Sequence, residues 1–164
     1  YQTPPPELTR LQDLQDCIGG GPVADTGAAA VLGALFVPEI ETLSMTRGIT
    51  VVNLGNSHTV AFLLFAGRIL GVFEHHTGML DDAALETHLA RFRRGELTFD
   101  TVFADRGHGC LTLDLPTQAG DFSPTFVLGP QRNLLAQHDV SFPAPGGDMM
   151  LAGCFGLMKG LALS

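Results

Sequence analysis

Histidine and aspartate side chains gather in three short polar segments of this sequence. His58 follows a polar turn, His75 and His76 end an apolar run, and Asp105 and His108 flank a glycine-containing turn. Imidazole and carboxylate groups bind divalent metals and exchange protons near neutral pH. Successive side chains of a strand point to opposite faces, so only one of His75 and His76 can join a given site. We therefore expect one metal or acid–base site that contains His58, one of these two histidines, Asp105 and His108, and the metal's identity stays open.

The other histidines and the cysteines carry weaker signals. We expect His88 on the solvent side of its helix and His138 in a loop, both with structural roles. The alternative for the other histidines is three unrelated surface turns, with one imidazole hydrogen-bonded in the core. Cys17, Cys110 and Cys154 are odd in number and show no metal-binding spacing, which indicates free thiols in a reducing, cytoplasmic environment.

The polar turn before His58 is a second candidate for chemistry. It contains Gly55, Asn56, Ser57 and, just beyond His58, Thr59. Small residues allow backbone N–H groups to point at an anion, and hydroxyl groups add donors. The sequence predicts a phosphate-binding hairpin at this point. The alternative is an ordinary hairpin whose turn is polar because it faces water.

Regular elements must position these residues. Runs rich in β-branched and aromatic residues at 49–54, 59–65 and 68–73 predict three antiparallel strands. The apolar spacing in 80–94, followed by Gly95, predicts a helix. We also expect helices at 7–18, 22–37 (ended by Pro38) and 149–163, short strands at 99–103, 110–115 and 125–128, and one or two helical turns at 132–138. This order predicts an α/β fold, a mixed sheet of about five strands with helices on its faces.

Composition narrows the class of protein. With 164 residues, 45% hydrophobic and 16% charged, the chain should form a globular domain with a sizeable core. A net charge of −8, with basic residues clustered only at 91–94, argues against a nucleic-acid partner. The apolar runs 28–38 and 149–163 are too short or too interrupted to predict a membrane span. Because the chain starts at Tyr1, we expect it to be a piece of a longer protein.

Four motifs, taken in order, resemble the second half of the actin-like ATPases. This superfamily has a ribonuclease H-like fold and includes actin, heat-shock chaperone ATPases, sugar kinases and acetate kinases. The motifs are the Ala-rich DTGAAAVLGAL, the hairpin NLGNSHT, the turn TFVLGPQR and the closing MMLAGCFGLMKGLA. The resemblance assigns residues 1–24 to an N-terminal helix and linker and residues 25–164 to an actin-like ATPase C-terminal subdomain. Within the superfamily, the chain is most similar to a group labelled pyruvate formate-lyase activating enzymes, although it lacks the cysteine cluster of such radical chemistry.

The resemblance implies ATP and Mg²⁺ as ligands. It assigns base or ribose contacts to Gly129, Pro130 and the turn from Gly153 to Gly156. Two departures matter, because Asn53 replaces the Asp that normally holds a metal-bound water, and Pro130 replaces a glycine and removes a backbone donor. The implied phosphate-binding residues are Asn53, Gly55, Asn56, Ser57, His58 and Thr59.

The resemblance also implies partners. The first phosphate hairpin would lie in an N-terminal half of the same protein, which is therefore an expected partner, and self-association is a further expectation. The function expected on this basis is nucleotide binding within a kinase or ATPase. The alternative is a metal-dependent hydrolase or metal-binding module that uses His58, His75, His76, Asp105 and His108.

Overall fold

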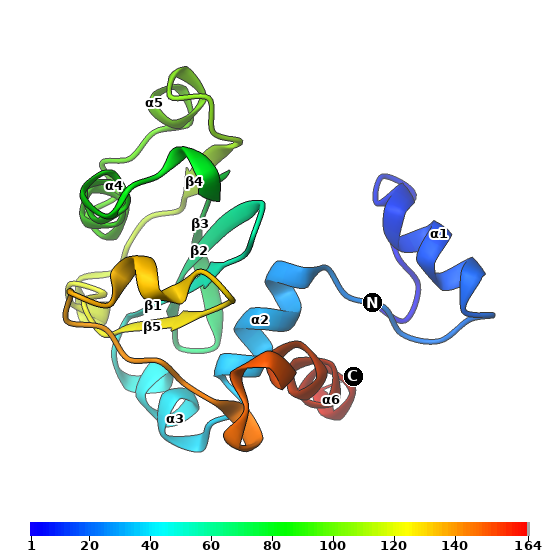
Figure 1. The fold of residues 1–164 in the computed structure, drawn as a ribbon. Coiled ribbons are helices and arrows are strands. Elements are labelled where there is room, and N and C mark those ends of the chain that lie inside the picture. Colours follow the sequence, from blue (N-terminus) through cyan, green and yellow to red (C-terminus); the bar gives the residue numbers. More distant parts are fainter. Residues whose placement is uncertain (164) are drawn as a thin grey trace.

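A five-stranded mixed sheet with the order β4-β3-β2-β1-β5 lies at the centre of the molecule (Figure 1). The computed structural model describes residues 1–163. Strand β1 is antiparallel to β2 and parallel to β5, and β3 is antiparallel to both β2 and β4. The strands are β1 (Ile49–Leu54), β2 (His58–Phe65), β3 (Arg68–His76), β4 (Gly109–Thr112) and β5 (Thr125–Leu128). The predicted mixed five-stranded sheet is confirmed.

Helices cover both faces of this sheet, and each face has its own apolar core. One core joins α2, α3 and α6 to one face, and the other joins α4 and α5 to the opposite face (Figure 1). The α-helices are α1 (Thr9–Cys17), α2 (Thr26–Ala34), α3 (Pro38–Thr46), α4 (Asp82–Arg93), α5 (Phe99–Ala104) and α6 (Ala152–Leu163). Short 3₁₀ turns lie at Thr77–Met79, Thr117–Ala119, Arg132–Leu135, Pro145–Gly147 and Met149–Leu151.

Two predictions about the secondary structure are wrong: one strand and one helix boundary. The segment predicted as a strand at 99–103 is helix α5, because the Thr98 side chain accepts a hydrogen bond from the Thr101 backbone N–H and caps a helix. Pro38, expected to end a helix, instead begins α3. Proline is tolerated in the first helical turn, where its missing N–H has no intrahelical partner.

Helices α2 and α6 pack with their backbones almost in contact. A Cβ added at Gly156 would lie 1.9 Å from the Ala29 carbonyl oxygen, and one at Gly33 would lie 2.2 Å from the Ala152 carbonyl oxygen. Only glycine allows this approach. The small residues of both helices thus serve close packing.

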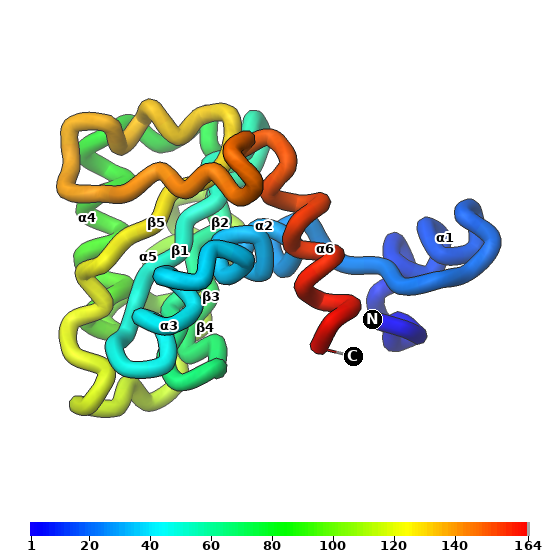
Figure 2. Tube along the Cα trace, turned by 90° about the horizontal axis from the view of Figure 1, so that it is seen from below, coloured from blue at the N-terminus to red at the C-terminus, as the bar shows by residue number. Residues whose placement is uncertain are grey.

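Helix α1 lies apart from the rest of the molecule, beyond an extended linker (Figure 2). None of its residues is buried. Its segment is held mainly to itself, with the N-terminal amine donating to the Val23 carbonyl at 2.8 Å. Within residues 1–163, no single helix is long and apolar enough to cross a membrane, and one bent pair, α2 with α3, passes that test only when taken together.

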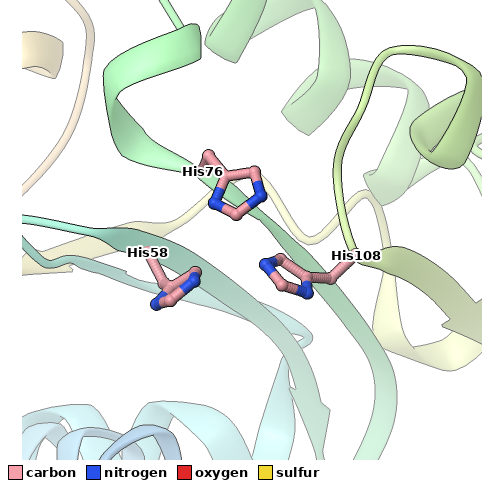
Figure 3. A group of neighbouring side chains, drawn as sticks. All are labelled: His58, His76 and His108. Atoms are coloured by element: carbon pink, nitrogen blue, oxygen red, sulfur yellow. The ribbon is translucent and has the colours of Figure 1, made fainter.

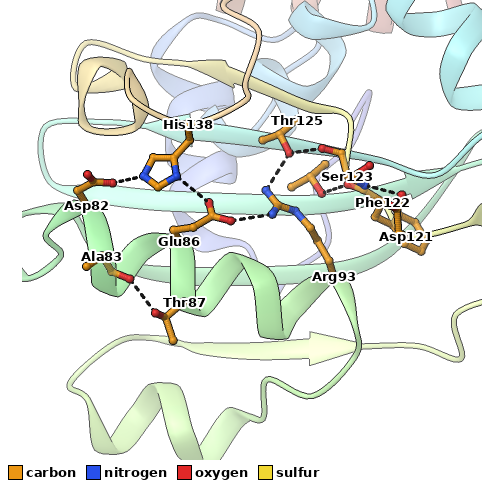
Figure 4. A network of polar contacts seen from close by, with 11 residues as sticks. Asp82, Ala83, Glu86, Thr87, Arg93, Asp121, Phe122, Ser123, Thr125 and His138 are labelled. Atoms are coloured by element: carbon orange, nitrogen blue, oxygen red, sulfur yellow. Dashed lines mark hydrogen bonds and ion pairs between the residues drawn. The ribbon is translucent and has the colours of Figure 1, made fainter.

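A polar network fastens α4 to β5 (Figure 4). Arg93 joins Glu86 at 3.1 Å and donates to the Thr125 hydroxyl at 2.8 Å. His138 pairs with Asp82 and lies 3.9 Å from Glu86. His138 therefore has the structural role that we predicted.

Candidate functional site at one end of the sheet

The candidate residues meet at one end of the sheet because of its strand directions. Strands β1 and β5 run parallel and both end here, β2 begins here, and β3 returns to the same end. The turn after β1, the turn after β5 and the segment after β3 are therefore neighbours, although they are far apart in sequence. Ends of parallel strands commonly carry ligand sites in α/β folds.

A cavity of about 420 Å³ opens where these turns meet. The Gln131 side-chain amide donates to the Asn56 side-chain oxygen at 2.9 Å, and the Gln131 backbone N–H donates to the Leu54 carbonyl at 3.0 Å. These bonds fix the two turns against each other. The cavity is lined by Asn56, Thr77, Gly78, Leu80, Pro130, Gln131, Asn133 and Leu134.

The predicted phosphate-binding residues divide into two sets. Asn56 and Ser57 are exposed at the tip of the hairpin, where a ligand can reach them. The Gly55 N–H, however, donates to the His58 carbonyl at 3.0 Å and is not free for an anion. Thr59 is fully buried, with its hydroxyl 3.0 Å from that of Thr77, so it faces the core and not the cavity.

The residues expected to contact the base also divide. Pro130 lines the cavity. Gly129 permits a close backbone approach, since an added Cβ would lie 2.3 Å from the Leu54 carbonyl oxygen and its φ is +96°. Gly156, in contrast, is buried against α2, so its small size serves helix packing. Gly153 lies on α6, half-buried and outside the cavity lining, and its contact with a base stays a prediction. Nothing in the sequence separates a glycine that serves packing from one that contacts a ligand.

Asn53 lies on β1, half-buried, between Val60 of β2 and Leu128 of β5. It does not line the cavity. A carboxamide carries no charge, so this position cannot supply the carboxylate that would hold a cation-bound water.

Three histidines form what we call the outer histidine group: His58, His76 and His108 (Figure 3). His58 begins β2, His76 ends β3 directly opposite it, and the His108 backbone N–H donates to the Glu74 carbonyl at 3.0 Å. One ring nitrogen from each residue lies within 4.8 Å of the other two. Ring centroids are separated by 5.2 Å for His58 and His76, 4.8 Å for His58 and His108, and 4.5 Å for His76 and His108.

Protonation of His76 is disfavoured within the outer group. Partial burial, followed by the nearby His108 and His58 rings, lowers the pKa of His76 below 6.5, while Glu74 acts weakly in the opposite direction. Among residues 1–163, no ring nitrogen of the three has a hydrogen-bond partner. Their lone pairs are therefore free to bind a ligand.

The other three residues form what we call the inner triad: His75, His88 and Asp105. His88 Nε2 lies 3.1 Å from Asp105 Oδ2, and His75 Nε2 lies 3.5 Å from the same oxygen. His75 is fully buried, and its Nδ1 is 3.2 Å from the His76 carbonyl oxygen. The hydrogen bond from His88, followed by the nearby His75, holds the pKa of Asp105 below its usual 3.8, against an opposing desolvation effect.

The structure thus replaces one predicted site with two groups. Strand alternation sends His76 to one face of the sheet and His75 to the other, and Asp105 joins His75 rather than His58 and His108. Sequence reasoning also misplaced His88, which is only 8% exposed and faces the sheet. Its spacing of three and four residues from the buried Leu85 and Phe92 could have shown that it lies on the buried face of α4.

Comparisons with known proteins identify the fold. No curated protein sequence matches the chain. MreB5 of Spiroplasma citri bound to ADP is similar at 12% identity and a TM-score of 0.51, over 99% of this chain and 68% of that chain. The same protein bound to AMPPNP matches at 12% identity and a TM-score of 0.52, over 98% and 66%. This chain spans about two thirds of the MreB5 length, and the predicted actin-like fold is confirmed.

The family comparison agrees with the sequence resemblance. A family described as "Putative pyruvate format-lyase activating enzyme (DUF1786)" matches residues 1–134, which is most of the chain. The chain belongs to this family.

Proposed function

We propose that this chain is the nucleotide-binding subdomain of an actin-like kinase or ATPase, with ATP and Mg²⁺ as its ligands. The observation that carries the proposal is the cavity formed where the hairpin after β1 meets the turn after β5, joined by Asn56 and Gln131. The similar MreB5 structures hold ADP and AMPPNP, which supports a nucleotide as the ligand class.

The cavity offers two kinds of wall. Leu80, Pro130 and Leu134 supply apolar surface that suits a base, and Asn56 with Gln131 supplies amide groups that suit phosphate or ribose oxygens. Mg²⁺ would enter with the nucleotide, because this cation usually keeps several waters and takes phosphate oxygens as ligands. Hydrolysis would require a group outside this cavity to position water, since Asn53 carries no charge.

Helix α6 carries an exposed apolar face that could receive the partner expected from the resemblance. Leu157, Met158 and Leu161 are 43%, 58% and 51% exposed along this helix. We infer that the N-terminal half of the same protein covers this apolar face, in keeping with the MreB5 chains being longer than this one. A dimer in sedimentation experiments on this chain, abolished by Leu161→Glu, would instead assign the face to self-association.

The nucleotide proposal is tested by titrating the chain with Mg-ATP in a calorimeter. Asn56→Asp keeps the acceptor that Gln131 needs but adds a negative charge at the cavity. We expect this variant to weaken binding about 10-fold, since such a charge near a phosphate costs roughly 1–4 kcal/mol. Gln118→Glu adds the same charge near the start of β1, at the opposite end of the sheet, and should bind like the parent chain.

Two results would reject this function. One is the absence of any Mg-ATP binding by the chain together with its N-terminal half. The other is binding that Asn56→Asp and Gln118→Glu weaken equally, which would reflect net charge and not this cavity.

A further inference from the structure

We propose that His58, His76 and His108 together bind one divalent transition-metal cation of the zinc class, with a coordination position left open to solvent. This site is separate from the nucleotide cavity in its ligands and does not depend on the proposed nucleotide-binding function. It assigns a role to the outer histidine group, which the fold does not require.

The backbone brings the three imidazoles together from separate segments. His58 and His76 are direct partners across β2 and β3, and the His108 backbone is bonded to Glu74, two residues before His76. A tetrahedral zinc site with Zn–N distances of about 2.0–2.1 Å places its ligand nitrogens roughly 3.3 Å apart. The three nitrogens, within 4.8 Å of one another, reach that spacing by small side-chain rotations, and His58 and His108 are exposed and free to make them.

The chemistry of the group selects a cation. The three imidazoles converge so that each can offer one ring nitrogen to the same cation. None of their ring nitrogens has a hydrogen-bond partner among the described residues. A bound cation would give these ring nitrogens a partner. Imidazole nitrogens suit zinc, cobalt, nickel and copper, whereas magnesium and calcium prefer oxygen ligands.

A shallow depression lies beside His108, one of the three proposed ligands. This depression has a volume of about 220 Å³, and Glu74, Phe99 and His108 contribute to its lining. Sites with three protein ligands and an open position hold water or an exchangeable oxygen ligand. The class of ligand that this site would take is therefore a small oxygen donor, such as water or a phosphate oxygen.

The inner triad is the competing position for a metal, and its packing argues against it. His88 Nε2 already forms a hydrogen bond with Asp105. The Gly107 backbone lies against the His75 ring, since a Cβ added there would be 2.3 Å from His75 Cδ2. The backbone therefore closes the Cδ2 side of that ring, although His75 Nε2 has no hydrogen-bond partner within residues 1–163. The triad therefore serves as the internal comparison in the test.

The test uses the chain purified without a polyhistidine tag and stripped with a chelator. Zn²⁺ is titrated by calorimetry, and Co²⁺ by its visible absorption, which reports the coordination geometry. We expect one metal per chain, with binding weakened by at least about 100-fold in His58→Ala, His76→Ala and His108→Ala. His138→Gln removes an imidazole elsewhere, keeps a polar side chain and should bind like the parent chain.

Three outcomes would overturn the proposal: no Zn²⁺ or Co²⁺ binding by the stripped chain, equal binding by all four variants, or binding lost in His88→Gln and retained in His76→Ala. Circular dichroism of each variant distinguishes a loss of metal binding from a loss of folding. Because Mg-ATP is not present in this titration, a failure of the nucleotide proposal would leave the result unchanged.

Discussion

The inner triad and the outer histidine group lie on opposite faces of β3, yet consecutive residues of that strand serve them. His75 points into the core beside Asp105, and His76 points outward beside two further imidazoles. The inner group contains a carboxylate that accepts from a ring nitrogen, whereas the outer group contains none. Histidine thus has a structural role on one face of β3, and on the other face it is available to bind a ligand.

This difference has an energetic meaning. Burying an imidazole costs free energy unless its nitrogens find partners. In the inner triad, the His76 carbonyl and Asp105 satisfy His75 Nδ1 and His88 Nε2, whereas His75 Nε2 and His88 Nδ1 are buried without a hydrogen-bond partner among residues 1–163. The outer group makes no such bonds, so its removal should cost the fold little. Stability and metal binding should therefore separate cleanly between the two groups.

The largest expected effect is on folding stability. His75→Ala removes a fully buried ring and leaves Asp105 with a single imidazole partner, so we expect the free energy of unfolding to fall by about 2–4 kcal/mol. His58→Ala removes an exposed ring and should shift the melting temperature by no more than about 2 °C. Urea titrations of both variants measure the free energies of unfolding, and thermal melts measure the melting temperatures. Equal losses would mean that the two groups contribute alike to the fold.

The second effect is stabilisation by metal. At a free Zn²⁺ concentration about 100 times its dissociation constant, binding to the folded chain should raise its stability by about 2.7 kcal/mol. Zn²⁺ should stabilise the parent chain and His88→Gln by this amount, and it should not stabilise His76→Ala. Thermal melts with and without Zn²⁺ make the measurement. A gain that disappears only in His88→Gln would exchange the roles of the two groups.

The sequence predicted these regions unequally, for physical reasons. Strand alternation correctly separated His75 from His76, because it is a local property of any β-strand. Which side chains lie beside His75 and which beside His76 depends on how the segment before β4 folds. That segment includes 99–103, which was wrongly predicted as a strand. As a helix, α5 ends at Ala104, and its C-cap residue Asp105 lies on the face of the sheet that α4 covers.

Long-range packing limited the other predictions in the same way. The three antiparallel strands within 49–76 could be identified from apolar runs and turn residues, which are local signals. Gly156 could not be separated from a ligand-binding glycine, because only the approach of α2 shows why the residue is small. Gln131 belongs to the TFVLGPQR turn but was assigned no contact, because its link to Asn56 depends on the parallel pairing of β1 with β5.

The third effect concerns the packing around each group. An added Cβ at Gly107 would lie 2.3 Å from the His75 ring and 2.6 Å from Val102 Cγ1, so Gly107→Ala should cost about 2 kcal/mol. Gly78, two residues after His76, has no atom within 4 Å of such a Cβ, and Gly78→Ala should be close to neutral. Melting temperatures of the two variants measure the contrast. A neutral Gly107→Ala would show that the inner triad is loosely packed, with room for a ligand after all.

The smallest effect is the pH dependence that the inner carboxylate confers. The pKa of Asp105 is below 3.8 in the folded chain, chiefly because His88 donates to the carboxylate, with His75 as the other group facing it. The unfolded chain therefore takes up this proton first, so the contribution is present above about pH 4 and disappears as the pH falls through the folded pKa. Asp105→Asn keeps an acceptor for His88 but lacks the charge, so its stability deficit should shrink between about pH 5 and pH 3.

The effect should be small, since 56% of the Asp105 side chain is exposed and solvent weakens the interaction. His58→Gln provides the comparison, because the outer group has no carboxylate partner and this variant should follow the acid unfolding profile of the parent chain. Melting temperatures across this range measure all three proteins. Parallel profiles for Asp105→Asn and the parent chain would show that the carboxylate is not needed to hold the two buried imidazoles. The distinction between the two groups would then depend on burial alone.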